Sequence, residues 1–279
     1  MIHPSAPALR RAYASWQYGQ IHYYDAGGEG VPILLLHQSP ASSSDWFPLI
    51  PFFTAAGLRV LAMDTPGMGL SDPLPHEPLL TDYADAVPVV LDHAGVDSAH
   101  LMGHHTGVQI AIEAAVRSPG RVRSAALYGV PVMGEEEREK YWQQIVTNEK
   151  KGLVHLPVTG GTHLTDHFRR IEGFYTPMGA QRMLLSAMLA GPLWWHGHNA
   201  ALRHNMVPAL LAARQPLLLI SNPGEMLDAN TTQAAALRPD AKYVMLETPG
   251  QMAMDDDPEG IARAAITFVN TVESGREQD

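Results

Sequence analysis

Apolar and polar positions alternate in blocks along the chain, and the blocks predict strands that take turns with helices. Short apolar runs of the kind that form buried parallel strands occur at residues 31–36, 58–63, 100–102, 122–128, 216–220 and 242–246. Two further runs, residues 14–18 and 20–25, predict an antiparallel hairpin that turns near Gly19. Together with the helices between them, these strands predict an α/β fold with a doubly wound, mostly parallel sheet.

The helical segments of this pattern lie between the strands. They are expected at residues 44–56, 79–94, 106–117 and 258–271. A serine run at the start of the first supplies good N-cap residues. Pro88 is expected to kink or divide the second, because proline removes a backbone donor inside a helix.

The rhythm breaks between residues 131 and 207. A charged run at 135–140 is followed by a Gly/Thr/His loop at 159–167 and by helical stretches at 181–190 and 197–211. We interpret residues 131–207 as a helical cap. It would be inserted into a core formed by residues 1–130 and 208–279.

Composition removes several classes of function. The 279 residues carry a formal net charge of −10 and contain no cysteine. Disulfides and thiolate chemistry are therefore excluded, and a cytoplasmic location is expected. No basic cluster suggests a nucleic-acid partner. With Pro4 and Pro7, the first eleven residues do not read as a signal peptide, and no apolar run of about 18 residues suggests a membrane partner.

The strongest chemical signal is the sequence GHHTG at residues 103–107. It follows an apolar strand and opens a helix, which is the context of a G-x-S-x-G nucleophile elbow. Glycines flank such an elbow because the sharp turn needs small neighbours. The central residue here is His105, where a serine would be expected.

Taken with four other features, this motif resembles the α/β-hydrolase superfamily. The others are HQSP at 37–40, DTPGMGLSD at 64–72, the cap insertion, and ETPGQMAMDDDP at 247–258. The resemblance covers residues 14–275 and implies an α/β-hydrolase fold with a helical cap. It also implies a site at the carboxyl ends of the strands, with the amides of Ser39 and Thr106 as the oxyanion hole.

The departures from the family pattern concern the catalytic triad. His105 replaces the nucleophile, and Gln251 stands where the family has its catalytic histidine. By position in the loop after the penultimate strand, Glu225 is the expected acid, with Asp228 as the weaker alternative. Loss of a triad serine or histidine lowers turnover by roughly 10⁶, so ordinary serine hydrolysis is not expected.

An imidazole at a helix N-terminus tends to be neutral, because the helix dipole disfavours its positive form. We therefore expect His105 to act as a base in a cofactor-independent enzyme. The reaction would be proton transfer or addition–elimination, of lyase, cyclase or isomerase type, on a small carbonyl or ester-like substrate. Gln251 would orient substrate or water. Two alternatives stay open: a hydrolase with an unconventional histidine centre, and a non-catalytic pseudoenzyme that binds a ligand. A homodimer is also left open.

Five more residues are candidates for the pocket wall: His37, Gln38, His104, Trp194 and Trp195. Structural roles are favoured for the two histidines. Gln38 would either reach the pocket or support its loop, and the tryptophans would either line an apolar pocket or pack within the cap. No metal is expected, because the histidine spacings match no specific ligand pattern.

Overall fold

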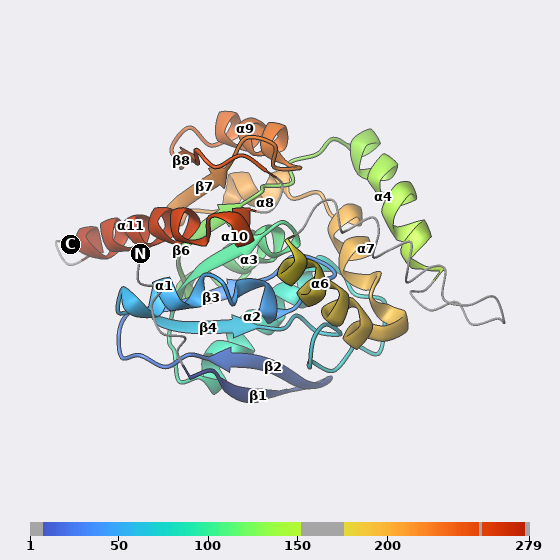
Figure 1. Ribbon diagram of the computed structural model, residues 1–279, viewed down its shortest axis with the longest axis horizontal. Helices are drawn as coiled ribbons and strands as arrows, with labels where there is room; N and C mark the ends of the chain where they lie inside the picture. The colour runs from blue at the N-terminus through green and yellow to red at the C-terminus, as the bar shows by residue number, and fades with distance from the viewer. Residues whose placement is uncertain (1–7, 152–175, 251–252, 277–279) are drawn as a thin grey trace.

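The computed structural model describes residues 8–151, 176–250 and 253–276, which contain one eight-stranded sheet (Figure 1). Its order is β1-β2-β4-β3-β5-β6-β7-β8. The strands are β1 (Arg10–Trp16), β2 (Gly19–Asp25), β3 (Pro32–Leu36), β4 (Arg59–Met63), β5 (Ala99–His104), β6 (Val122–Tyr128), β7 (Leu217–Ser221) and β8 (Lys242–Met245). β2 is antiparallel to both β1 and β4, and the pairs from β4 to β8 are parallel. The predicted mostly parallel sheet and its hairpin are confirmed.

Helices cover both faces of the sheet. Strands in the middle of the sheet contribute to both apolar clusters, one on each face, because successive side chains of a strand point to opposite sides. In β3, Leu34 and Leu36 join one apolar cluster, whereas Ile33 and Leu35 join the other. The first cluster includes residues of α2 (Leu80–His93), α3 (Thr106–Arg117), α7 (His196–Arg203), α8 (Val207–Ala212) and α9 (Asp228–Leu237). The second includes residues of α1 (Ile50–Ala55), α10 (Ala253–Asp256) and α11 (Pro258–Arg276). The fold is therefore doubly wound, as predicted.

Two helices differ from expectation. The segment expected at 44–56 forms a 3-10 turn, η1 (Ser43–Trp46), and then α1, because Pro48 has no N–H with which to continue the first turn. α2 runs unbroken through Pro88, so of the expected kink or division, the division does not occur. Seven of its residues are buried, and packing of an apolar face outweighs the bond that the proline removes.

The segment between β6 and β7 is helical in its described parts. It holds α4 (Glu135–Glu149), α6 (Pro177–Ala190), η3 (Gly191–Leu193), α7 and α8. The charged run expected at 135–140 forms the first turns of α4, where acidic residues are favoured by the helix dipole. The stretch expected at 197–211 is two helices instead of one. The loop expected at 159–167 lies outside the described residues.

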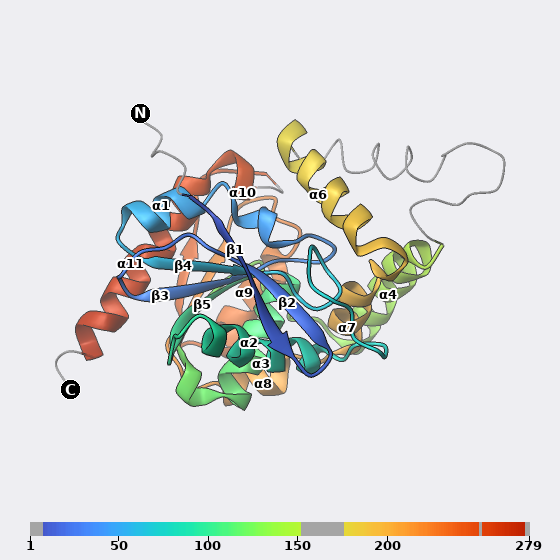
Figure 2. The same cartoon turned by 90° about the horizontal axis from the view of Figure 1, so that it is seen from below.

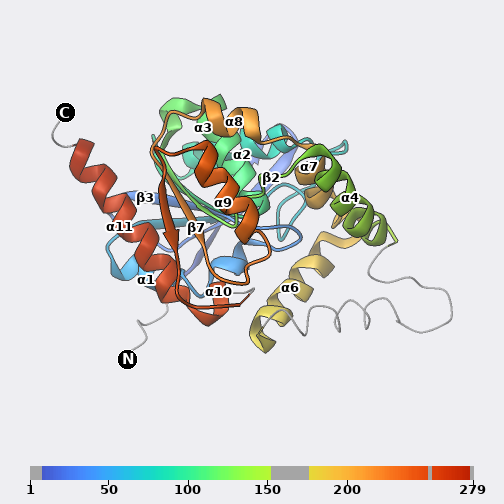
Figure 3. The same cartoon turned by 90° about the horizontal axis from the view of Figure 1, so that it is seen from above.

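Figures 2 and 3 show α4, α6 and α7 grouped beyond one side of the sheet and its flanking helices. The group contacts the core at specific points: Ser186 Oγ of α6 lies 2.8 Å from Ser42 Oγ, just before η1. The division into a core and a 131–207 cap stays a prediction. None of the helices in the described residues is both long and apolar enough to span a bilayer.

Candidate functional site

The candidate site lies where neighbouring parallel strands end. His37 follows β3, His105 follows β5, Gly129 follows β6, and the loop after β7 carries Glu225. These four strands are consecutive in the sheet. Their carboxyl ends therefore bring residues together that lie far apart in the sequence.

His105 occupies a strained turn between β5 and α3. Its φ of 47° and ψ of −105° make it the one non-glycine residue with positive φ in the described chain. Such backbone strain costs about 1–3 kcal/mol. A Cβ at Gly103 would meet the carbonyl of Gly107, and a Cβ at Gly107 would meet that of Leu36. The flanking glycines thus permit the elbow conformation predicted from the motif.

The imidazole of His105 contacts the carboxylate of Glu225 directly. His105 Nε2 lies 2.7 Å from Glu225 Oε1, and the side chains are 18% and 0% exposed. Burial alone would raise the pKa of Glu225, but the charge and hydrogen bond of His105 outweigh it and hold that pKa below its ordinary value. An ionised carboxylate only accepts hydrogen bonds. Nε2 must therefore carry a proton, which leaves the lone pair of the neutral ring on Nδ1.

Nδ1 is the atom of this pair that remains available for chemistry. No residue in the described parts of the chain hydrogen-bonds to it. Because His105 keeps 18% of its side chain exposed, the ring is accessible from outside the protein core. The arrangement is an imidazole held by a buried carboxylate through one nitrogen, while the other nitrogen has no hydrogen-bond partner in the described chain.

The loop after β7 distinguishes its two acidic candidates. The backbone N–H of Leu227 donates to Glu225 Oε2 at 2.7 Å, which fixes the carboxylate. Asp228 Oδ1 accepts instead from Ser221 Oγ at 2.9 Å. The carboxylate that meets the elbow residue is therefore that of Glu225.

A second histidine–carboxylate pair lies directly behind the first. His104 Nδ1 is 2.9 Å from Asp45 Oδ2, and both side chains are buried. The His104 ring stacks on Tyr128 and its centroid is 4.3 Å from that of His105. Burial, reinforced by the neighbouring His105, lowers the pKa of His104. Asp45 was missed from the sequence, although a buried histidine in the motif already required a polar partner.

The loop after β3, which the sequence predicts to form the oxyanion hole, meets the elbow through its backbone. The N–H of Ser39 points to Thr106 Oγ1 at 3.4 Å, and Thr106 begins α3. His37 is neutral because burial lowers its pKa. Its Nδ1–H donates to the carbonyl of Gln38 at 2.7 Å, and its Nε2 accepts from the N–H of Thr65 at 3.0 Å. His37 thus braces the loop.

Other predicted residues lie around this centre or outside it. Gln38 is buried, and its Nε2 has no hydrogen-bond partner in the described chain. Trp194 donates from Nε1 to the carbonyl of Glu149 at 2.8 Å and packs on Ala187 within the helical insertion. Trp195 lies under Lys150 Nζ, 4.1 Å from the ring centroid. Gln251 lies outside the described residues.

The opposite end of the sheet holds another chain of polar groups. Ser124 Oγ is 2.7 Å from His100 Nδ1, and His100 Nε2 is 3.1 Å from Glu273 Oε1. Glu273 also accepts from Arg123 at 2.7 Å. Ser124 is 0% exposed and His100 is 1% exposed. No substrate reaches this serine, so the chain of bonds fastens α11 to β5 and β6.

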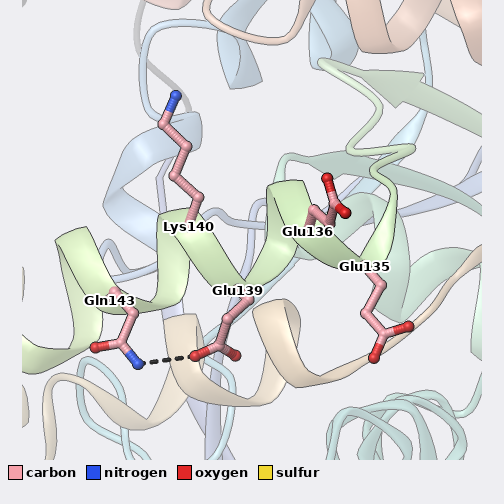
Figure 4. Close-up of a pocket in the computed structure, with 5 residues that line it drawn as sticks. All are labelled: Glu135, Glu136, Glu139, Lys140 and Gln143. Carbon is pink, nitrogen blue, oxygen red and sulfur yellow. Dashed lines mark hydrogen bonds between the residues drawn. The ribbon is translucent and has the colours of Figure 1, made fainter.

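A hollow also lies along α4 (Figure 4). It is lined by Glu135, Glu136, Glu139, Lys140 and Gln143, all from one side of the same helix. Gln143 Nε2 donates to Glu139 Oε1 at 2.8 Å. Among the described residues no three histidine or acidic side chains are grouped to hold a metal ion. The hollow is a solvated helix face without the convergent groups of a reaction site.

Comparisons with known proteins agree on one family. Residues 31–155 match the family model described as alpha/beta hydrolase fold. A 2-hydroxy-6-oxononadienedioate/2-hydroxy-6-oxononatrienedioate hydrolase of Paraburkholderia phymatum is 34% identical over 209 residues, which are 69% of this chain and 73% of that protein. The acetyltransferase component of the acetoin cleaving system of Pseudomonas putida is 24% identical over 89% of this chain, which spans 66% of that protein's length.

Solved structures have the same fold. The crystal structure of E-2-(acetamidomethylene)succinate hydrolase superposes with a TM-score of 0.78 at 20% identity, covering 94% of this chain and 100% of that one. The enol-lactonase of Burkholderia xenovorans gives a TM-score of 0.74 at 19% identity, with 93% and 100% coverage. With this fold, and with a hydrolase relative matched over most of its length, the chain belongs to the α/β-hydrolase fold family.

Proposed function

We propose that the chain is a cofactor-independent enzyme in which His105 is a general base acting on a small carbonyl or ester-like substrate. The observation that carries the proposal is the 2.7 Å bond between His105 Nε2 and Glu225 Oε1. It orients the ring, fixes the proton on Nε2 and leaves Nδ1 free. In the usual triad an acid orients a histidine that in turn activates a serine. Here the acid orients the elbow residue itself.

Each remaining group has a chemical role in this scheme. Nδ1 takes a proton from the substrate, and Glu225 stabilises the imidazolium that forms. The backbone amides of Ser39 and Thr106 hold the oxygen on which negative charge develops, and the N–H of Ser39 leaves its 3.4 Å contact with Thr106 Oγ1 to do so. Gln251 has no titratable proton, and we assign it to the orientation of substrate or water.

Two reaction types fit a base at this position. In the first, Nδ1 removes a proton from a carbon or hydroxyl of the substrate, which leads to elimination, isomerisation or cyclisation. In the second, Nδ1 removes a proton from water, which then attacks the carbonyl. Several relatives are named hydrolases, and we therefore keep the second reaction type, hydrolysis, as the alternative to the first. Turnover in H₂¹⁸O separates them, because only hydrolysis places the heavy oxygen in a product carboxylate.

His105→Ala tests the proposal. Substrates to screen are 2-hydroxy-6-oxo-dienedioates, enol lactones and simple esters. For any substrate that the wild type converts, the variant is expected to lose about 10²–10⁴-fold in kcat/KM, the usual contribution of a general base. His76→Ala, at a side chain that is 45% exposed, is the control and keeps wild-type turnover.

Unchanged turnover by His105→Ala would rule out the base role. Binding of these compounds by the wild type without conversion would favour the pseudoenzyme instead.

A further inference from the structure

The end of β6 carries a glycine against the elbow histidine. A Cβ built on Gly129 would lie 2.7 Å from His105 Nε2, closer still to its Cδ2, and 3.3 Å from Glu225 Oε1. Carbon atoms in favourable contact keep about 3.5–4.0 Å. Any side chain at position 129 would therefore occupy the space through which the ring reaches the acid.

We propose that Gly129 is a positioning residue that makes the histidine elbow possible, because its missing side chain leaves room for the His105–Glu225 pair. Its significance for catalysis rests on the proposed function. A small hydroxyl at the elbow would not fill this space, whereas the imidazole ring does. The pair thus depends on three positions: the elbow, the acid loop and the end of β6.

A competing explanation is that Gly129 is needed only for its backbone. Its φ is +66°, a conformation that residues with a Cβ adopt at a cost. Gly95, after α2, has the same φ of +66°, but a Cβ there would meet nothing within 4 Å. Gly95→Ala therefore reproduces the backbone cost without the contact and is a matched control.

A double-mutant cycle separates the two explanations. Gly129→Ala is expected to lower the melting temperature more than Gly95→Ala does. In the His105→Ala background the ring is gone and only the 3.3 Å contact with Glu225 Oε1 remains, so the difference in cost between the two glycine substitutions should become much smaller. An equal cost of Gly129→Ala in both backgrounds would overturn the proposal. So would failure of Gly129→Ala to fold in both, whereas folding only in the His105→Ala background would support it.

A second measurement follows the ring itself. In protein with ¹⁵N-labelled histidine, wild type and Gly95→Ala should show His105 protonated on Nε2 in its neutral form. Gly129→Ala should lose this tautomer preference. An unchanged His105 spectrum in folded Gly129→Ala would contradict the proposal.

The experiments distinguish failure of the proposed function from failure of the role proposed for Gly129. If His105→Ala leaves turnover intact while the cycle and the spectra behave as expected, Gly129 positions the pair but the pair is not the base.

Discussion

In the proposed function, the imidazole at the elbow would take the place of two members of a triad with one side chain. His105 lies at the turn where the family places its nucleophile, yet it bonds to Glu225, the partner of the family's histidine. The sequence predicts both residues, because each follows a recognisable strand. It does not predict their direct bond, which depends on the space above Gly129 and on the buried His104–Asp45 pair behind the ring.

Glu225→Gln tests how much the negative charge of Glu225 contributes to the stability of this pair. The glutamine keeps the size of the side chain but cannot accept a charge-assisted bond, so we expect a loss of about 1–3 kcal/mol in the free energy of unfolding at pH 7. The pKa of Glu225 is held below its ordinary value of 4.5 by His105, although burial opposes this. Its stabilisation is therefore full above pH 4.5 and disappears as the pH falls through the lowered pKa of the folded state.

Urea unfolding at pH 7, 5 and 3.5 measures this effect. The difference between wild type and Glu225→Gln should shrink towards low pH, while the exposed Glu247→Gln control matches wild type throughout. A difference that grows as the pH falls would contradict the assigned ionisation.

At the scale of elements, one carboxylate holds the first turns of α6 to α10, in addition to the contact between Ser186 and Ser42. Asp255, at the start of α10, accepts from Thr176 Oγ1 at 3.1 Å and forms an ion pair with Arg182. Thr176 in turn caps α6 by accepting from the N–H of Gly179 at 3.1 Å. Asp255 thus joins the first two turns of α6 to the segment that follows Gln251.

Asp255→Asn should loosen α6 without unfolding the sheet. Amides of residues 179–186 are expected to exchange with deuterium at least several-fold faster, because the variant loses the ion pair with Arg182 and weakens the hold on Thr176. β5 and β6 should keep wild-type protection. Asp256→Asn, at the exposed neighbouring position, is the control. Identical exchange in both variants would show that Asp255 does not hold the helix.

The observed elements also show which helices and strands the sequence pattern could predict. Buried strands such as β3 are continuous apolar runs and were placed almost to the residue. The sequence pattern did not predict α9. The residues of Asp228–Leu237 are mostly small or polar, and the helix has no clear apolar face. α4 was taken as a charged run, since it buries only Val146 and Glu149. Helices that owe their position to contacts with other elements have a weak local signal.

At the scale of the molecule, buried histidines make stability depend on pH. Burial lowers the pKa of His37 and His104, and it lowers the pKa of His100 to about 4. The unfolded chain binds protons at these residues below pH 6.5 while the folded chain does not, so stability falls as the pH drops through this range. His198 opposes the trend: burial lowers its pKa, but Glu149 outweighs this and raises it.

Burial also lowers the pKa of His196. With four histidines in the described chain against one, the melting temperature should fall by several degrees between pH 7 and pH 5. Calorimetry at constant ionic strength measures it. His100→Gln should reduce the drop, and His76→Gln, at an exposed position, should not. A melting temperature that rises towards pH 5 would contradict the balance.

The buried trio of Ser124, His100 and Glu273 has a consequence for how enzymes are recognised. Its distances of 2.7 and 3.1 Å are those of a serine–histidine–acid triad, but the serine contacts Nδ1 and the acid contacts Nε2, which is the reverse of the catalytic arrangement. A search by distance alone would therefore place a serine-hydrolase site at the amino ends of the strands. Solvent access to the serine oxygen also separates this structural chain of hydrogen bonds from a reactive nucleophile. A fluorophosphonate reagent, which reacts only with an accessible serine, would leave Ser124 unmodified.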